Sequence, residues 1–348
     1  MKKINVLLFA VAMAACAASN VMAAQKTAAK NSKQIIAQRE AGLRSISEDA
    51  ARAHVYFLAD DLLEGRRAGQ RGSRIAKQYI ISQIREAGLK PLLGDSYEQP
   101  FDACAVQKLK RGVRFFVEAD SVAEIKKQVH QTMHLSNVLT VLPGKKNDEY
   151  VVVGAHLDHE GVYPDVEGDN IYNGADDNAS GVSAVLQIMK AFKESGATPE
   201  RTIIFAFWDG EEYGLLGSRY FTENFTDMPK VKGYLNFDMV GSGTDSKYLM
   251  YFFTAAHPKL GEWLKSDMKT YGFTTFDPDY RAWENPVGGS DQQSFHLKGV
   301  PIVWYHTGGQ PHYNFPSDEP QTINYPKLTD ITRASYLTTW RLANESEY

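Results

Sequence analysis

Acidic and histidine side chains follow four apolar runs of this 348-residue sequence, and they are its clearest candidates for chemistry. The runs cover residues 150–153, 201–208, 233–240 and 299–305. The polar residues at or just beyond their ends are His156 and Asp158, the pair Glu211 and Glu212, Asp238, and the loop 306–318. A further pair, Asp176 and Asp177, opens a helical pattern. Because crowded carboxylates repel one another unless cations neutralise them, the pattern predicts a metal site.

One imidazole combined with several carboxylates is typical of zinc ligands, and a carboxylate that bridges two ions is typical of two-metal sites. Taken singly, these residues have ordinary explanations. A histidine after a strand is commonly structural, and acidic pairs commonly begin helices because the helix dipole favours negative charge there. The convergence of several such residues at strand ends favours the metal site.

The elements that position these residues alternate between strands and helices. Each apolar run is typical of a buried strand, and helical patterns cover residues 46–63, 71–89 and 329–343, with another after residue 181. Ser47 is the expected N-cap of the first helix, and Gly88 the expected stop of the second. The alternation predicts an α/β fold of three layers, αβα, around a mostly parallel, doubly wound sheet. In such sheets ligands bind at the carboxyl ends of the strands.

Composition narrows the class of protein. The chain is 43% hydrophobic and 23% charged, and it is long enough to bury a substantial core. Its net charge of −4 and pI near 6.2 give no electrostatic case for nucleic acid as a partner. We expect no transmembrane span, and the sequence leaves the oligomeric state open.

Residues 1–23 have the pattern of an export signal, with Lys2 and Lys3 ahead of an apolar stretch and a small-residue cleavage site. This predicts a periplasmic or extracellular protein. An imperfect lipoprotein box before Cys16 leaves lipid anchoring as the alternative, and Cys104 would then be the only other cysteine. We expect residues 24–40 to be loosely ordered and residues 41–348 to form a single catalytic domain.

Four segments resemble, in order and spacing, the co-catalytic zinc exopeptidases of metallopeptidase family twenty-eight. They are GAHLDH, NGADDNASG, DGEEYGLLGS and LNFDMVG. The upstream segments HVYFLADDLLEGRRAG and AKQYIISQIREAGLKP are similar to the N-terminal helices of bacterial members. The resemblance runs from about residue 46 to 331. It implies a zinc exopeptidase fold of the phosphorylase/hydrolase-like type and an aminopeptidase that removes N-terminal residues from peptides.

The resemblance implies a role for each matching residue. His156 and Asp238 would bind one zinc ion, Glu212 would bind the other, and Asp176 would bridge both. Asp177 would support the turn that points Asp176 inward.

Two more residues would act beside the metal ligands. Glu211 would be the general base that takes a proton from the attacking water and passes it to the leaving amine. Asp158 would orient the imidazole of His156.

Three positions depart from the family pattern, because an amide stands where histidine is customary: Gln292, Gln310 and Asn314. Asn314 falls at the final ligand and is a poor one, since a neutral amide oxygen competes weakly with water. His312 is the predicted substitute, and His306 is a second candidate. A weakened or single-metal site is the alternative.

These departures leave three functions open. The first is a zinc-dependent aminopeptidase, and the second is a silenced relative that binds peptides or amino acids. The third is an aminoacyltransferase of the glutaminyl cyclase kind. The remaining histidines show no partner in the sequence and are interpreted as structural: His54, His130, His134, His159, His257 and His296.

Overall fold

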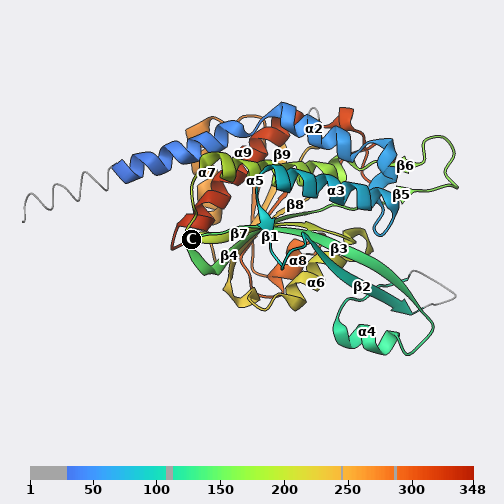
Figure 1. Ribbon diagram of the computed structural model, residues 1–348. Helices are drawn as coiled ribbons and strands as arrows, with labels where there is room; N and C mark the ends of the chain where they lie inside the picture. The colour runs from blue at the N-terminus through green and yellow to red at the C-terminus, as the bar shows by residue number, and fades with distance from the viewer. Residues whose placement is uncertain (1–29, 107–112, 244–245, 286–287) are drawn as a thin grey trace, which may run out of the picture.

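The computed structural model describes residues 30–106, 113–243, 246–285 and 288–348. A mixed sheet lies between layers of helices (Figure 1), which confirms the α/β class. The strands of this sheet are β1 (Lys90–Pro91), β2 (Glu98–Val106), β3 (His130–Leu142), β4 (Lys146–His156), β7 (Arg201–Trp208), β8 (Val231–Phe237), β9 (Tyr248–Thr254), β10 (Asp277–Trp283) and β11 (Ile302–His306). The α-helices include α2 (Glu48–Leu58), α3 (Arg71–Glu86), α4 (Ala119–Ile125), α5 (Gly181–Ser195), α6 (Leu216–Asn224), α7 (Lys259–Tyr271), α8 (Gln292–His296) and α9 (Tyr325–Asn344). Shorter elements are η1 (Asp61–Arg66), η2 (Ala175–Ser180), η3 (Glu211–Tyr213), η4 (Met228–Lys230), η5 (Pro320–Thr322) and the small hairpin of β5 (Gly161–Val162) and β6 (Ile171–Tyr172).

The described strands run in the order β1-β3-β7-β4-β8-β11-β9-β10, and β2 pairs with β3. The four central strands, β7, β4, β8 and β11, are parallel to their neighbours within this group. The flanking strands β3 and β9 join them antiparallel. The predicted parallel sheet is therefore correct at its centre, and all four central strands end at the same edge.

Strand β4 shows how the sheet separates two apolar layers. Val151 and Val153 pack in one cluster with residues of α2, α3, α5 and α9. Val152 points the other way and packs with Phe221 of α6 and Phe295 of α8. Because alternate side chains of a strand face opposite sides, this arrangement gives the predicted three layers.

The predicted elements agree closely with the observed ones. Strand β7 covers residues 201–208 as expected, and every residue in it is buried. Ser47 caps α2 by accepting from Ala50 N at 3.3 Å, although the helix ends at Leu58 and a kinked 3-10 segment follows. Gly88 follows α3 with φ of 67°, where a residue without a side chain is least strained.

The N-terminal lead differs from the expectation, because residues 30–45 form a helix. Alanine, lysine and glutamine are good helix formers, and the second half of this helix has tertiary partners. Gln38 donates to the Gly196 carbonyl at 3.1 Å, and Tyr336 donates to the Arg39 carbonyl at 3.2 Å. Residues 24–29, the export signal at 1–23 and Cys16 lie outside the described residues. The assignment of 41–348 to one domain stays a prediction.

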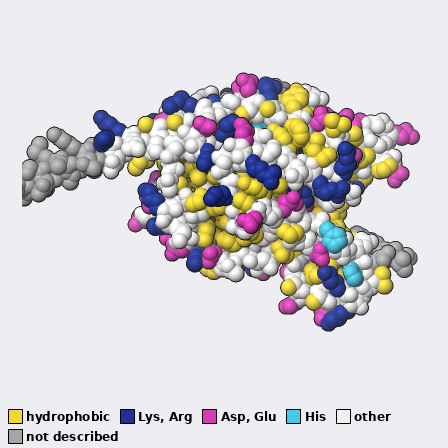
Figure 2. All heavy atoms as spheres, viewed as in Figure 1, with side chains coloured by type: hydrophobic (Ala, Val, Ile, Leu, Met, Phe, Trp, Pro, Cys, Tyr) yellow, Lys and Arg dark blue, Asp and Glu magenta, His cyan; other side chains and the backbone are white. Residues whose placement is uncertain are grey.

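Strands β2 and β3 carry α4 away from the body of the sheet as an arm (Figure 1). Basic and acidic side chains are interspersed over the face that Figure 2 shows, in keeping with the small net charge. Within the described ranges, no helix has the length and apolar character that crossing a bilayer requires.

Candidate metal centre

His156 ends β4, and its ring is buried at the carboxyl edge of the sheet. Its Nδ1 lies 3.1 Å from the backbone oxygen of Asp158, which can only accept, so the neutral ring carries its proton there. The Nε2 lone pair then faces Asp177 Oδ1 at 3.3 Å and Asp238 Oδ1 at 3.4 Å. Burial would lower the pKa of His156, but Glu211, Asp177 and Asp238 together raise it well above its usual value. The arrangement therefore attracts a proton or a metal cation.

Asp177, and not Asp176, belongs to this cluster. The Oδ1 of Asp177 faces His156, and its Oδ2 lies 3.7 Å from His159 Nδ1. The Oδ1 of Asp176 instead accepts from Gly241 N at 2.8 Å. The structure thus places Asp177, and not Asp176, beside His156, because η2 points the two consecutive carboxylates in different directions. The metal roles expected for this pair stay a prediction.

The turn that carries Asp177 is anchored by Asp318, a buried residue of the loop after β11. The Asp318 carboxylate accepts from the backbone N of Asp176 and of Asp177, both at 3.0 Å. Its own carbonyl accepts from Ala175 N at 3.0 Å. Gln310, one of the positions where histidine was expected, donates to Asp318 at 3.4 Å. The loop thereby fixes the turn without supplying an imidazole.

Glu211 and Glu212 lie on η3, which follows β7 and the left-handed Gly210 (φ 78°). The carboxylate of Asp158 accepts from Glu211 N at 3.1 Å, which fixes the start of η3. Asp158 Oδ1 lies 4.0 Å from His156 Nδ1, so the side chain is close to the imidazole it was predicted to orient. Burial raises the pKa of Glu211 well above its usual value and raises that of Glu212 to about 7.

A buried arginine, Arg66 of η1, lies behind the acidic cluster. Its guanidinium donates to the backbone carbonyls of Leu58, Leu157, Asn173 and Gly174 at 2.5–3.1 Å. Burial lowers the pKa of Arg66 to about 10, while Asp177, Asp318, Asp158 and Glu212 act to raise it. Arg66 therefore contributes a fixed positive charge beside these carboxylates.

The predicted substitute ligand, His312, lies outside the cluster. Its Nδ1 is 2.9 Å from Ser317 Oγ, and its backbone N donates to the side chain of Gln310. Asn314 is exposed and left-handed, with φ of 55°. His306 does line the cavity, but its Nδ1 lies 2.7 Å from the Asp238 carbonyl. The structure does not place His312 among the residues that line the cluster, and its role as a metal ligand stays a prediction.

The cluster lines a cavity of about 260 Å³. Among the described residues, His156, Asp177 and Glu212 offer ligand atoms that all lie within 4.8 Å of one another. The cavity wall also includes Glu211, Asp238, Met239, Gly289, Trp304, His306, Gly309 and Tyr313. Acidic, apolar and aromatic groups thus share the wall of one small cavity.

The sequence analysis missed one residue of this region, His159. Its ring is fully buried, and its Nδ1 lies 2.8 Å from Glu212 Oε1. The only sequence signal was its position in GAHLDH, three residues after His156 and in the same loop.

Comparison with known proteins identifies the family. Residues 137–339 match the model described as peptidase family M28. The chain belongs to this family. A leucine aminopeptidase 2 from Trichophyton equinum is 31% identical over 182 residues, which cover 50% of this chain and 34% of that protein. The matched stretch spans about a third of the length of the curated relatives.

Solved structures show the same fold. A zinc aminopeptidase from Bacillus subtilis has a TM-score of 0.65 at 14% identity, over 87% of this chain and 97% of that one. A glutaminyl cyclase from Porphyromonas gingivalis has a TM-score of 0.62 at 16% identity, over 84% of this chain and 98% of that one. At these identities the likeness establishes the fold alone.

The residues of this M28 chain fit a zinc site. Histidine nitrogen and carboxylate oxygens are suitable zinc ligands, and here they are buried and converge on one another. Asp158 Oδ2, a buried oxygen without a partner in the described residues, belongs to a side chain beside His156. Several carboxylates there have pKa values raised by burial, a cost that a bound cation would offset.

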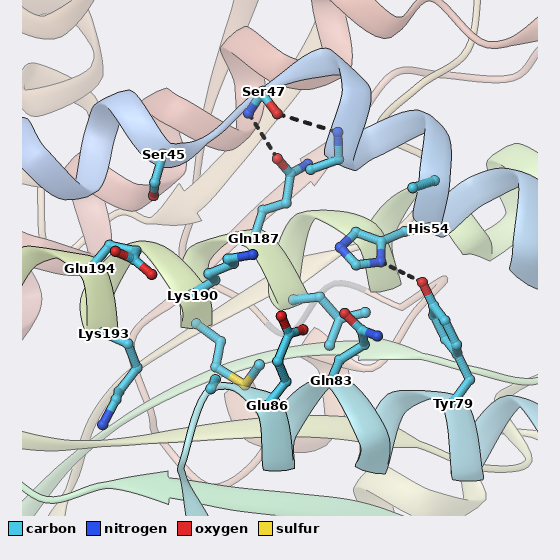
Figure 3. Close-up of a pocket in the computed structure, with 15 residues that line it drawn as sticks. Ser45, Ser47, His54, Tyr79, Gln83, Glu86, Gln187, Lys190, Lys193 and Glu194 are labelled. Carbon is cyan, nitrogen blue, oxygen red and sulfur yellow. Dashed lines mark hydrogen bonds between the residues drawn. The ribbon is translucent and has the colours of Figure 1, made fainter.

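A larger cavity of about 620 Å³ lies away from this cluster, between α2, α3 and α5 (Figure 3). His54 and Tyr79 point toward each other at one side of it, with His54 Nδ1 2.8 Å from the Tyr79 hydroxyl. Ser47 N donates to Gln187 Oε1 at 3.0 Å. Among the described residues, the group that could hold a metal lies at the sheet edge and not in this larger cavity.

His54 gives a prediction for stability against pH. Burial, helped by Lys190, lowers the pKa of His54 from 6.5 to about 4. The unfolded chain therefore takes up a proton below pH 6.5 that the folded chain refuses until about pH 4. The contribution of His54 to the free energy of unfolding is fully present above pH 6.5 and is lost as the pH falls toward 4. At pH 5 the loss is about 2 kcal/mol.

Urea unfolding at about pH 7.5 and about pH 5 checks this prediction in wild type and the variant His54→Gln. Between these two pH values the free energy of unfolding should fall by about 2 kcal/mol more in wild type than in His54→Gln. The exposed His134, changed to Gln, should behave like wild type. Equal losses in wild type and His54→Gln would show that His54 does not titrate as described.

Proposed function

We propose that this chain is an exported, zinc-dependent aminopeptidase that hydrolyses N-terminal residues from peptides. The observation that carries the proposal is the convergence of Glu211 with His156, Asp177, Glu212 and Asp238 on one small cavity. Membership of family M28 supports it. The export part rests on the sequence of residues 1–23, outside the described residues.

The ligand roles follow from which atoms face one another. His156 and Asp238 would hold one ion, Glu212 would contribute to a second, and Asp177 would face both through its two oxygens. Bound zinc supplies Lewis acidity and lowers the pKa of water toward neutrality.

Glu211 would handle the proton. Its backbone is fixed by Asp158, and its side chain lines the cavity beside His156 and Asp238. Because burial raises its pKa, Glu211 can accept a proton from water near neutral pH and return it to the departing amine. A residue that only positioned a peptide would not require this proton affinity.

The cavity also bears on the substrate. Its volume of about 260 Å³ is below the usual range of small-molecule pockets, which suits one terminal residue better than an extended chain. Met239, Trp304 and Tyr313 give part of its wall an apolar character. The carboxylates of the same wall would attract the ammonium group of a free N-terminus.

A panel of chromogenic aminoacyl anilides tests the proposal, with zinc-equilibrated protein. We expect leucyl anilide to be hydrolysed and its N-acetylated form to be inert, because acetylation removes the ammonium group. Chelation should abolish turnover, and added zinc should restore it. Equal turnover of the two forms would contradict an aminopeptidase.

The same panel addresses the two other functions. A silenced relative would bind leucine peptides without hydrolysing any anilide. A glutaminyl cyclase would release ammonia from peptides with N-terminal glutamine and leave leucyl anilide intact. Either result would overturn the proposed hydrolysis.

A further inference from the structure

His159 is held rigidly beside the metal cluster. Its backbone N lies 3.4 Å from the Arg66 carbonyl, and its ring lies against Gly174. A β-carbon on Gly174 would approach His159 Cδ2 to 2.5 Å, so the ring fills the space that this glycine leaves open. The ring cannot swing freely, and its Nδ1 stays directed at the carboxylates of Glu212 and Asp177.

Asp177 lies between two imidazoles, and each imidazole has a further carboxylate. On one side, Asp177 Oδ1 is 3.3 Å from His156 Nε2, which is 3.4 Å from Asp238 Oδ1. On the other side, Asp177 Oδ2 is 3.7 Å from His159 Nδ1, which is 2.8 Å from Glu212 Oε1. The two halves of the cluster therefore contain the same kinds of donor atoms.

The separations of His159 Nδ1 from the Glu212 and Asp177 oxygens are close to those of ligands that share an ion. Two ligands of a tetrahedral zinc ion, each about 2.0–2.1 Å from it, lie about 3.3 Å apart. The distances from His159 Nδ1 to its two carboxylate neighbours lie on either side of that value. A single N–H on Nδ1 can serve one of the two oxygens well, whereas a cation between the three atoms serves both.

The loop after β11 leaves this half of the cluster without another imidazole. Asn314 is exposed, and His312 is directed at Ser317. We propose that His159 supplies the imidazole ligand of the second metal position, together with Glu212 and Asp177. This inference rests on the proposed function and locates the ligand that the amide at Asn314 cannot provide.

The test compares zinc binding by wild type, His159→Gln and His312→Gln. Glutamine keeps an N–H that can orient Glu212 but is a poor zinc ligand, so the substitution removes ligation and spares orientation. Zinc content comes from elemental analysis, and the affinity of each position from competition with a chromophoric chelator. Wild type and His312→Gln should bind about two equivalents.

In His159→Gln, one zinc equivalent should bind with wild-type affinity, and the affinity for the other should fall by more than about 100-fold. This loss exceeds the usual effect of removing a group that only orients a ligand. Circular dichroism and urea unfolding of the zinc-free proteins control for the fold. If the variant does not fold, a crystal structure of zinc-loaded wild type replaces it. Anomalous scattering should then place the second ion beside His159 Nδ1.

The outcomes separate the two proposals. Two unweakened equivalents in His159→Gln, or an anomalous peak away from His159, would overturn the role of His159 and leave the zinc aminopeptidase intact. Binding of one zinc equivalent by both wild type and His159→Gln would likewise overturn the role of His159 and leave the zinc aminopeptidase intact. A wild-type protein that binds no zinc would overturn the proposed function, and this inference with it.

Discussion

Replacing Glu211 with glutamine should lower the kcat for leucyl anilide by about 10²–10⁴-fold, the range typical of losing a general acid or base. Glutamine has nearly the same shape but cannot take up the proton of the attacking water. Because Glu211 faces the cavity without being one of the assigned ligands, zinc content should stay at the wild-type level. The measurement is steady-state kinetics together with elemental analysis of the same sample.

The neighbouring variant Glu212→Gln provides the matched control. It removes the same charge from the next residue of η3, but Glu212 is part of the group that can hold a metal. We expect both turnover and zinc content to fall. Unchanged kcat in Glu211→Gln would rule out Glu211 as the base, and loss of zinc in that variant would make it a ligand.

The pair Asp176 and Asp177 should respond very differently to the same substitution. Asp177→Asn should weaken zinc binding at both positions and lower turnover by at least about 100-fold, because Asp177 faces His156 and His159 through its two oxygens. An amide keeps one oxygen but loses the charge that favours a bridged pair of cations.

Asp176→Asn should keep zinc content at the wild-type level and turnover within a few-fold of it. The Asn oxygen can still accept from Gly241 N. Burial, with Asp318 nearby, raises the pKa of Asp176 well above its usual value, so a neutral amide resembles its protonated form. The opposite pattern, in which only Asp176→Asn loses zinc, would restore the roles expected from the sequence. Zinc analysis and kinetics of both variants decide between them.

The framework of the site was predictable because strong local patterns specify it. Continuous apolar runs such as 201–208 mark strands buried on both faces, and their polar ends mark the edge where ligands bind. His156, Glu211, Glu212 and Asp238 each come directly from such an end. Their convergence follows from the parallel alignment of the three strands β4, β7 and β8 and needs no knowledge of the loops.

The roles of Asp176 and Asp177 were not predictable in the same way. Which of two adjacent carboxylates points inward depends on the backbone of η2, and Asp318 fixes that backbone from 141 residues away in the sequence. The position of His312 was not predictable for a similar reason, since its contact with Ser317 is set by the loop itself. Local sequence patterns do not encode such contacts, so they do not determine which of two adjacent residues in a turn faces the site.

Arg66 has a consequence for the electrostatics of the site when no ion is bound. Its charge belongs to the chain and stays beside the carboxylates whether or not an ion is bound. The chain itself therefore offsets part of the repulsion among these carboxylates, independently of any bound cation.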